Sequence, residues 1–246
     1  MKLYLAIDNS ISKMKGIVQH ISNNANIQLL QSFYKSSNWC CCSITKDYIL
    51  DSGCFSFIMD KNKLKGINLR KYVDCYCRFI KRYNVDKYME MDLDAYLDYK
   101  DVCAIRKYIE SQCNTKSIPV WHKSRGRKEF TNLIKQYDYI AIGGLAISRP
   151  KPEELYIYKD MVREAHQNNC KVHMLGVSNV KILKSVLPDS SDSSSWIFSR
   201  KVNKEYKFIN NRIVYRNNVE NKSGIELLYD SFGEWIKYQN YLTGIK

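Results

Sequence analysis

Two short acidic motifs in this 246-residue chain combine residue types that could carry out chemistry. The first is Asp51-Ser52-Gly53-Cys54-Phe55-Ser56, and the second is Asp192-Ser193-Ser194-Ser195-Trp196. Two carboxylates near one pocket can divide a glycosidic exchange between a nucleophile and a proton-transfer group. The turn Gly143-Gly144 lies between the motifs, and glycines let backbone amides approach a flat ligand closely. Together the motifs indicate an enzyme that exchanges the base on a sugar.

Each motif also has a purely structural interpretation. Asp51-Ser52-Gly53 is typical of a turn after a strand, and a tight turn alone would account for Gly143-Gly144. Asp192 shares its serine-rich stretch with Asp189, and helix capping would explain either aspartate. We favour Asp192 because it directly precedes an apolar segment that we predict to be a strand, residues 194–198.

The apolar runs predict short strands that alternate with helices. We expect strands at Leu3–Ile7, Ile27–Gln31, Tyr48–Asp51, Tyr88–Asp92, Ile118–Trp121, Tyr139–Ile142, Val172–Leu175 and Ser194–Phe198. We expect helices at Leu69–Tyr83, Asp101–Gln112, Arg127–Gln136, Pro152–Asn168, Val180–Val186 and Gly224–Leu242. Short strands between helices imply a parallel sheet. The sequence therefore predicts an α/β fold, a (β/α)8 TIM-like barrel that forms a single domain over residues 1–246, with an open doubly wound sheet as the alternative.

Polar residues gather where the predicted strands end, at Asp51-Ser52, Asp92, Trp121-His122, Gly143-Gly144 and Gly176. The carboxyl ends of barrel strands converge on one mouth, so this pattern favours the barrel and predicts one site there. Solvent-facing alternation would account for one or two of Asp92, Asp94 and Asp98, and Asp92 is favoured among the three by its apolar neighbours Met89 and Met91. His173 is expected to be a core residue without a catalytic role.

The charge balance indicates a polyanionic partner. The chain has 39 Lys and Arg against 25 Asp and Glu, a formal net charge of +14, which favours nucleic-acid binding through counterion release. A solvated basic surface without a partner is the alternative. Basic residues interleave with aromatic ones in two stretches, and the predicted nucleic-acid contacts are Lys123, Arg125, Arg127, Lys128, Arg200 and Lys201.

The cysteines and the apolar runs argue against a disulfide-rich, a secreted or a membrane-spanning protein. The nine cysteines form no paired Cys-x-x-Cys array, so we expect most of them to be small buried hydrophobic residues in a reducing compartment. No apolar run approaches the roughly 18 residues that a membrane span needs, and the first residues are typical of a strand and not of a signal peptide. We expect a cytoplasmic protein without membrane contact.

The motifs resemble those of the tRNA-guanine transglycosylase superfamily, most closely its short DpdA-type DNA 7-deazaguanine transglycosylases of phages and bacteria. The family's Asp-Ser-Gly-Gly-Phe-Gln is similar to Asp51–Ser56, and its Gly-Gly-Leu-Ala is similar to Gly143–Ala146. Its Tyr-Leu-Met-Gly-Val-Gly is similar to His173–Ser178, and its nucleophile segment, Phe-Asp-Cys/Ser-Val, resembles Asp192 with its serines. The four motifs occur in the family order over about residues 48–200.

The resemblance implies a role for each acid. Asp192 would attack C1′ of the sugar and form a covalent glycosyl-enzyme, which an incoming 7-deazaguanine then resolves. Asp51 would exchange protons with the two bases, for which a raised pKa in a dry pocket is suitable. Asp92 would accept hydrogen bonds from the Watson–Crick edge of guanine. The other predicted substrate-binding residues are Phe55 for stacking, Gly143, Gly144 and Leu145 for backbone contacts, and Trp121, His122, Leu175 and Gly176.

Departures from the family pattern modify this expectation. The chain has no cysteine after Cys170, so the family's zinc site after the nucleophile is absent, and we expect neither a metal nor another cofactor. Trp121-His122 replaces a family glutamine. No long RNA-binding extension follows, which favours DNA over tRNA by analogy. The leading hypothesis is exchange of guanine in DNA for a free 7-deazaguanine base such as preQ0, in a host cytoplasm if the protein is viral. The alternatives are base exchange on tRNA and a non-catalytic nucleic-acid-binding barrel.

Overall fold

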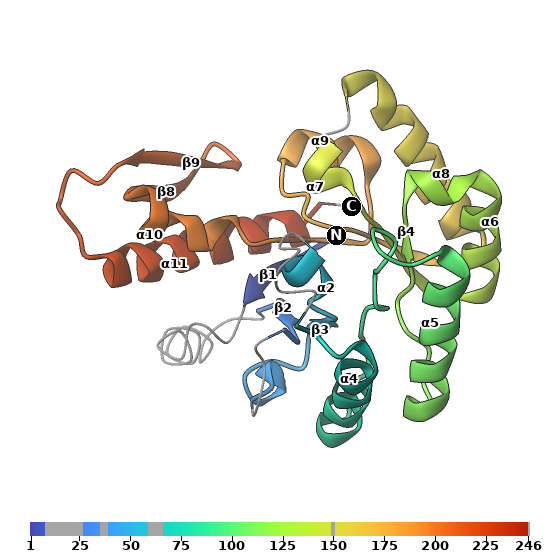
Figure 1. Cartoon of the computed structure of the whole chain (residues 1–246). Coiled ribbons are helices and arrows are strands. Elements are labelled where there is room, and N and C mark those ends of the chain that lie inside the picture. Colours follow the sequence, from blue (N-terminus) through green and yellow to red (C-terminus); the bar gives the residue numbers. More distant parts are fainter. Residues whose placement is uncertain (8–26, 35–38, 59–65, 149–150, 246) are drawn as a thin grey trace.

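The computed structural model describes residues 1–7, 27–34, 39–58, 66–148 and 151–245. Seven parallel strands form one curled sheet in the order β3-β2-β1-β7-β6-β5-β4, and helices cover its outer side (Figure 1). The strands are β1 (Lys2–Ile7), β2 (Leu29–Ser32), β3 (Tyr48–Asp51), β4 (Val120–Trp121), β5 (Tyr139–Ile142), β6 (Lys171–Met174) and β7 (Ser190–Ser193). The predicted parallel α/β fold is therefore confirmed.

The two faces of the sheet have different surroundings. On the outer face, alternate residues such as Leu3, Leu5 and Ile140 belong to a large apolar core shared with the helices. On the inner face, a second, smaller cluster joins residues from one edge of the sheet to the other, namely Tyr4, Leu30, Ile49, Met89, Ile118, Val120 and Ala141. Because residues of both edges meet in one small cluster, the sheet must curl around it.

The segment that we predicted as a strand at Tyr88–Asp92 forms only isolated bridges to both edges of the sheet. Leu50 of β3 bridges Tyr88, and Met89 bridges Ile118 just before β4. The amide of Met89 donates to the Leu50 carbonyl at 2.8 Å, and the amide of Ile118 donates to the Tyr88 carbonyl at 2.7 Å. The segment thus lies between the two edges and brings Asp92 to the same region as Asp51.

The strand predicted at Ser194–Phe198 is wrong, because the seventh strand is Ser190–Ser193 and contains Asp192. The polar serines fit a buried strand because the sheet satisfies their hydroxyl groups; Ser191 Oγ, for example, donates to the Met174 carbonyl at 2.7 Å. The apolar residues that follow form a 3-10 turn, where the fully buried Trp196 donates its indole N–H to the Ala6 carbonyl. Asp192 is consequently held inside the sheet and not in a loop.

The predicted helices are all present, with small differences at their ends. They are α4 (Leu69–Tyr83), α5 (Tyr99–Cys113), α6 (Gly126–Gln136), α8 (Leu155–Gln167), α9 (Val180–Val186) and α11 (Gly224–Thr243). Three short helices that we did not predict each come soon after a strand in the chain. They are α2 (Cys54–Ile58) after β3, α7 (Leu145–Ser148) after β5 and α10 (Phe198–Val202) after β7. Within the described ranges, no helix is long and apolar enough to cross a membrane.

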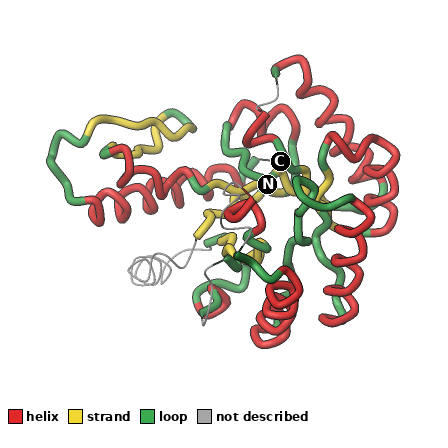
Figure 2. The backbone as a smooth tube through the Cα atoms, in the orientation of Figure 1, coloured by secondary structure: helices red, strands yellow, loops and turns green. Residues whose placement is uncertain are grey.

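An unpredicted antiparallel hairpin, β8 (Lys204–Ile209) and β9 (Arg212–Asn217), lies on α11 at a distance from the sheet (Figures 1 and 2). Its turn residues Asn210 and Asn211 both have positive φ angles, as a type I′ hairpin turn requires. The half of α11 on which the turn end of the hairpin packs is fixed to the sheet by Gln239, whose side-chain amide donates to the Leu3 carbonyl at 2.6 Å. The helix therefore contacts both the hairpin and the sheet.

Candidate active site

Asp92 and Asp192 both lie within electrostatic reach of Asp51, toward the carboxyl end of the sheet. Burial raises the pKa of Asp51 to about 7, and the negative charges of Asp192 and Asp92 add to this rise. Asp51 and Asp192 are 141 positions apart in the sequence and can act on each other in this way only if the fold brings them close. An acid with a pKa near neutrality can both give and take a proton under physiological conditions.

Asp51 is fixed by a tight turn at the end of β3. Its Oδ2 accepts a hydrogen bond from the amide of Gly53 at 2.9 Å. Gly53 has a φ of +78°, and a Cβ atom there would lie 2.4 Å from the Cβ of Tyr34. The Asp-Ser-Gly motif thus forms the turn that its sequence predicts, and the same turn positions the carboxyl group. Phe55 follows on α2 with 56% of its surface exposed, so its ring is accessible to a ligand.

Asp192 is held by donors that converge on one of its two oxygens. The amide of Gly176 donates to Asp192 Oδ1 at 2.7 Å, and His173 Nε2 lies 3.2 Å from the same oxygen. Among the described residues, no hydrogen bond is made to Oδ2. The side chain is only 12% exposed. The carboxylate is therefore oriented through Oδ1, and Oδ2 is the oxygen available to a substrate.

His173 belongs to a buried chain of hydrogen bonds that the sequence did not indicate. Its Nδ1 lies 2.7 Å from Ser190 Oγ, which is also hydrogen-bonded to the hydroxyl of Tyr139. Burial raises the pKa of Tyr139, so its hydroxyl keeps its proton and can donate. The partners then assign the hydrogens: Tyr139 donates to Ser190, Ser190 donates to Nδ1, and Nε2 donates to the carboxylate. The sequence signal for this chain of hydrogen bonds was weak. Residues 190 and 192 are two positions apart on one strand and therefore lie on one face of the sheet, and residue 173 pairs with residue 190 on the neighbouring strand.

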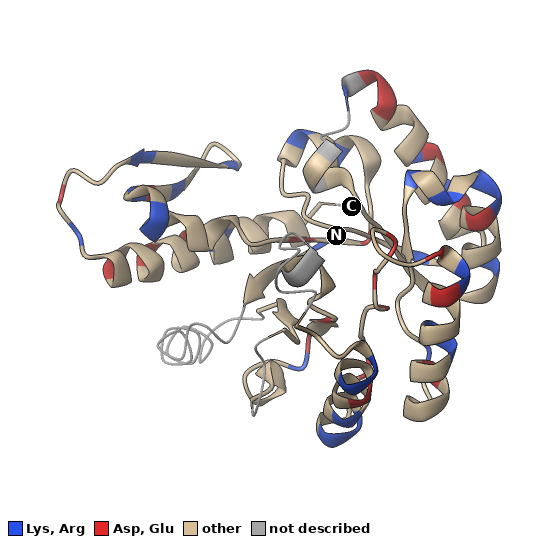
Figure 3. Cartoon of the chain, in the orientation of Figure 1, with Lys and Arg blue, Asp and Glu red and all other residues tan. Residues whose placement is uncertain are grey.

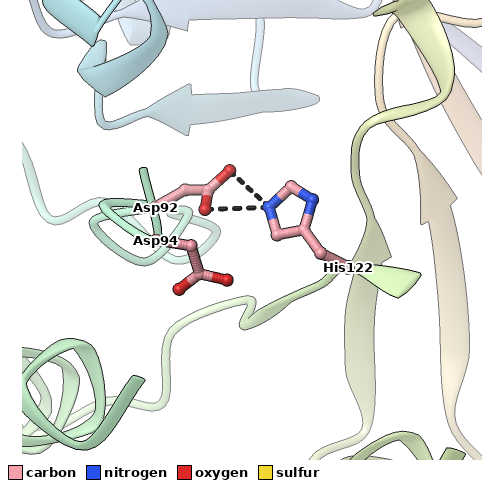
Figure 4. A group of neighbouring side chains, drawn as sticks. All are labelled: Asp92, Asp94 and His122. Atoms are coloured by element: carbon pink, nitrogen blue, oxygen red, sulfur yellow. Dashed lines mark hydrogen bonds and ion pairs between the residues drawn. The ribbon is translucent and has the colours of Figure 1, made fainter. Parts of the chain in front are cut away.

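Asp92 is paired with His122. His122 Nε2 lies 2.8 Å from both carboxylate oxygens of Asp92 (Figure 4). Burial disfavours the charged imidazole, but the hydrogen bond and the charge of Asp92 outweigh this effect and raise the pKa of His122. A ligand with adjacent N–H donors would meet a carboxylate whose orientation is already fixed by the imidazole.

Gly143 makes room for this histidine. A Cβ atom at Gly143 would lie 2.5 Å from His122 Cε1 and 2.8 Å from Val120 Cγ1. Gly144 has a φ of +83°, a conformation that favours glycine, and it leads into α7, which begins at the buried Leu145. The glycine turn and His122 are therefore one packing unit, which the separate motifs did not reveal.

Arg125, predicted as a nucleic-acid contact, is instead buried against the carboxylates of Glu90 and Asp94. Its side chain is 2% exposed. Its guanidinium donates to both oxygens of Asp94 at 2.7 and 2.8 Å and to Glu90 Oε1 at 2.8 Å, and it stacks 4.3 Å above the ring of Tyr99. This residue holds the loop that carries the acids and does not face solvent.

The donor atoms of Asp92, Asp94 and His122 lie within 4.8 Å of one another, a spacing that could hold a metal ion. Both oxygens of Asp94 are already paired with Arg125, whose guanidinium also lies 3.8 Å from Asp92 Oδ1. This fixed positive charge would repel a cation at the same position. We therefore assign no metal to the cluster.

The remaining predicted residues fall into two groups. Trp121 packs in the core against Phe130 and donates its indole N–H to the Gly126 carbonyl, so it does not line the acidic site. Leu175, next to Gly176, packs against the inner cluster of the sheet. The predicted basic residues other than Arg125 are exposed, namely Lys123, Arg127, Lys128, Arg200 and Lys201. Of these, Lys123 pairs with Glu154 and Arg127 with Glu164.

A large groove of about 1140 Å³ lies elsewhere, along α4. Its lining includes Phe33, Ile67, Tyr72 and Arg82, and none of the three aspartates. We therefore place the candidate site by the convergence of the acids and not by the size of this groove.

Comparisons with known proteins support the fold and do not test the chemistry. No family model matches the chain, and no curated protein matches it in sequence. In three dimensions it is similar to a crystal structure from Coccidioides immitis that is provisionally described as a fructose-1,6-biphosphate aldolase. The TM-score is 0.57 over 99% of this chain and 89% of that chain, at 8% identity. Such a likeness shows the fold alone, which is TIM-barrel-like.

Proposed function

We propose that this protein is a transglycosylase that exchanges guanine in DNA for a 7-deazaguanine base such as preQ0. The observation that carries the proposal is the different environment of each acid. Asp51 has a pKa of about 7, Asp92 is fixed by His122, and Asp192 has one oxygen held and the other open. These environments fit a proton carrier, a base-recognition group and a nucleophile, the set that the family resemblance implies.

In the proposed first step, Asp192 Oδ2 attacks C1′ of the target nucleotide. A C1′–O bond forms as the C1′–N bond breaks, and the bonding electrons leave with guanine. Asp51, whose raised pKa lets it carry a proton near neutral pH, gives that proton to the departing base. The two donors on Asp192 Oδ1 keep the carboxylate in a single orientation during the attack.

In the second step, the incoming base loses its N–H proton to Asp51, which is now ionised. The base nitrogen attacks C1′, and Asp192 leaves as a carboxylate, so the configuration at C1′ is retained. Because C1′ is shielded within a stacked duplex, the target nucleotide must be extruded to reach the acids. We further propose that the segment Tyr88–Asp92 closes the sheet into a complete barrel, with the acids at its mouth.

The test is incorporation of labelled guanine or preQ0 into duplex DNA and, in parallel, into tRNA. We expect wild type to label DNA, and Asp192→Ala to label neither substrate. Asp160→Asn is a matched control, because this aspartate is about 58% exposed on the surface and, among the described residues, pairs only with Arg163. Label in tRNA alone would mean that the substrate is tRNA and would leave the proposed mechanism unchanged. Binding without label in either substrate would favour the non-catalytic barrel.

A covalent trap examines the nucleophile separately. In the absence of a free base, wild type should form a DNA adduct that survives denaturing electrophoresis, and Asp192→Asn should not. An adduct that persists in Asp192→Asn would assign the nucleophile to another residue.

A further inference from the structure

The hairpin formed by β8 and β9 has an unusual distribution of charge. Residues 198–217, which comprise α10 and the hairpin, contain six basic residues: Arg200, Lys201, Lys204, Lys207, Arg212 and Arg216. The single acidic residue in this stretch, Glu205, is buried and pairs with Lys222. The surface of this segment therefore presents cations without an exposed anion (Figure 3).

These cations differ from Lys123, Arg125 and Arg127 in forming no salt bridge within the described ranges, although Lys207 lies near enough to Glu234 for its charge to act on that carboxyl. Lys123, Arg125 and Arg127 all form salt bridges with carboxylates. No salt bridge to the six cations occurs within the part of the chain that the structure describes. Two of them lie against aromatic rings, with Lys204 Nζ 4.5 Å from the ring of Tyr215 and Lys201 Nζ 5.1 Å from that of Phe198. Cations without a carboxylate partner remain available for phosphates.

The register of the hairpin separates its two faces. One face packs on α11, with Tyr206 against Trp235 and Phe208 against Tyr238. Lys207, Arg212 and Arg216 occupy the opposite parity, because Lys207 pairs with Val214 and Arg212 pairs with Ile209. Four residues of a strand span about 13 Å, so Arg212 and Arg216 can reach separate phosphates along one backbone.

The turn end of the hairpin lies over the part of α11 that contacts the sheet, because Phe208, next to the turn, packs on Tyr238 and Tyr241. Arg200 follows Asp192 by eight positions, and its side-chain stem packs on Gly224 at the start of α11, where a Cβ atom would lie 2.9 Å from Arg200 Cγ. The ribbon thus runs along α11, with its turn toward the part of the helix that is fixed to the sheet and its open end toward the start of the helix.

We propose that the β8–β9 ribbon is an arm that docks double-stranded DNA, with Lys207, Arg212 and Arg216 on the phosphates. A two-stranded ribbon fits the major groove of B-DNA, which is about 12 Å wide, and this favours a duplex over a folded RNA, whose major groove is deep and narrow. This role of the ribbon rests on the proposed function, and it specifies that the DNA substrate is double-stranded. The duplex would lie along the ribbon while one nucleotide turns out toward the acids.

The experiment measures duplex binding directly, so that its outcome does not depend on catalysis. The triple variant Lys207→Gln/Arg212→Gln/Arg216→Gln is titrated with a labelled 30-base-pair duplex at several salt concentrations. We expect the slope of log K against log salt to fall by about 2.7 and affinity to fall on the order of 10²-fold at 0.1 M salt. The control Lys123→Gln/Arg127→Gln/Lys128→Gln removes the same charge and should change the slope by less than about 1.

Several outcomes would overturn the assignment. Equal losses in the two triple variants would mean that net charge, and not the ribbon, determines binding. Loss of tRNA binding with duplex binding unchanged would assign the ribbon to RNA. A measurement on wild type avoids any folding defect in the variants: duplex binding should slow amide hydrogen exchange in residues 204–217, and protection confined to other segments would contradict the proposal. Label incorporation by wild type remains a separate test of the chemistry.

Discussion

The imidazole of His173 and the carboxylate of Asp192 are joined through a single oxygen, with His173 Nε2 3.2 Å from Asp192 Oδ1. The amide of Gly176 donates to the same oxygen at 2.7 Å. A carboxylate held in this way has one constrained and one open oxygen, which is the arrangement that a directed attack requires. The histidine contacts the proposed nucleophile, and we assign it the role of a positioning residue for that carboxylate.

Replacing His173 should slow exchange without abolishing it. His173→Phe removes the donor to Asp192 and leaves the hydroxyl of Ser190 without its acceptor. Loss of one preorganised donor typically reduces kcat on the order of 10²-fold. We expect steady-state assays to show this loss in kcat with little change in KM for the base. His173→Gln retains an amide donor and should recover part of the rate, whereas equal loss in both variants would indicate a packing role.

The raised pKa of Asp51 should make its ionisation destabilising. The folded-state value is about 7, above the value of roughly 3.9 in an unfolded chain. Between these values the folded state binds more protons, so its contribution to stability declines as pH rises from about 4 to 7. Asp51→Asn should therefore stabilise the protein by an amount that grows over this range, to on the order of a few kcal/mol above pH 7. Denaturant unfolding of wild type and Asp51→Asn at pH 4, 6 and 8 measures this difference in unfolding free energy. A stabilisation that does not change with pH would contradict the raised pKa of Asp51.

Gly143→Ala should disconnect His122 from Asp92. The added Cβ would lie 2.5 Å from the imidazole, so the ring must move away from the carboxylate 2.8 Å from it. We expect a loss of about 1–3 kcal/mol in unfolding free energy and a raised KM for the incoming base. Gly233→Ala is the matched control, because its Cβ would meet nothing within 4 Å in α11. That change should be neutral or slightly stabilising.

Arg125→Ala should act on stability and not on the salt dependence of DNA binding. It would leave Glu90, which is 1% exposed, and Asp94 without their shared guanidinium. Breaking a buried pair from one side typically costs about 3–5 kcal/mol. Arg125→Lys should recover little, because an ammonium cannot replace the bidentate contact. Arg127→Ala, at a half-exposed ion pair, should cost less than about 1 kcal/mol. A reduced salt slope in folded Arg125→Ala would instead return this residue to the DNA interface.

Local periodicity was sufficient to predict most of the elements. Strands at Tyr48–Asp51 and Tyr139–Ile142 and helices at Leu69–Tyr83 and Val180–Val186 have the predicted bounds, because apolar alternation and helical spacing are short-range properties. The seventh strand was misplaced because its serines carry no apolar signal and become suitable for a sheet only when neighbouring carbonyl groups accept their hydroxyls.

The sequence by itself therefore determined the alternation of strands and helices, the parallel sheet and the acids that stand near its carboxyl end. Only the tertiary structure decided which of those side chains face one another. Trp121 lies in the core, and Arg125 is paired with carboxylates more than 30 positions away in the sequence. His173 lies within hydrogen-bond distance of Asp192. These outcomes depend on the register and curl of the sheet, which pair residues 16 to 35 positions apart. Such pairings follow from the summed packing of the whole chain and leave no periodic trace in the sequence.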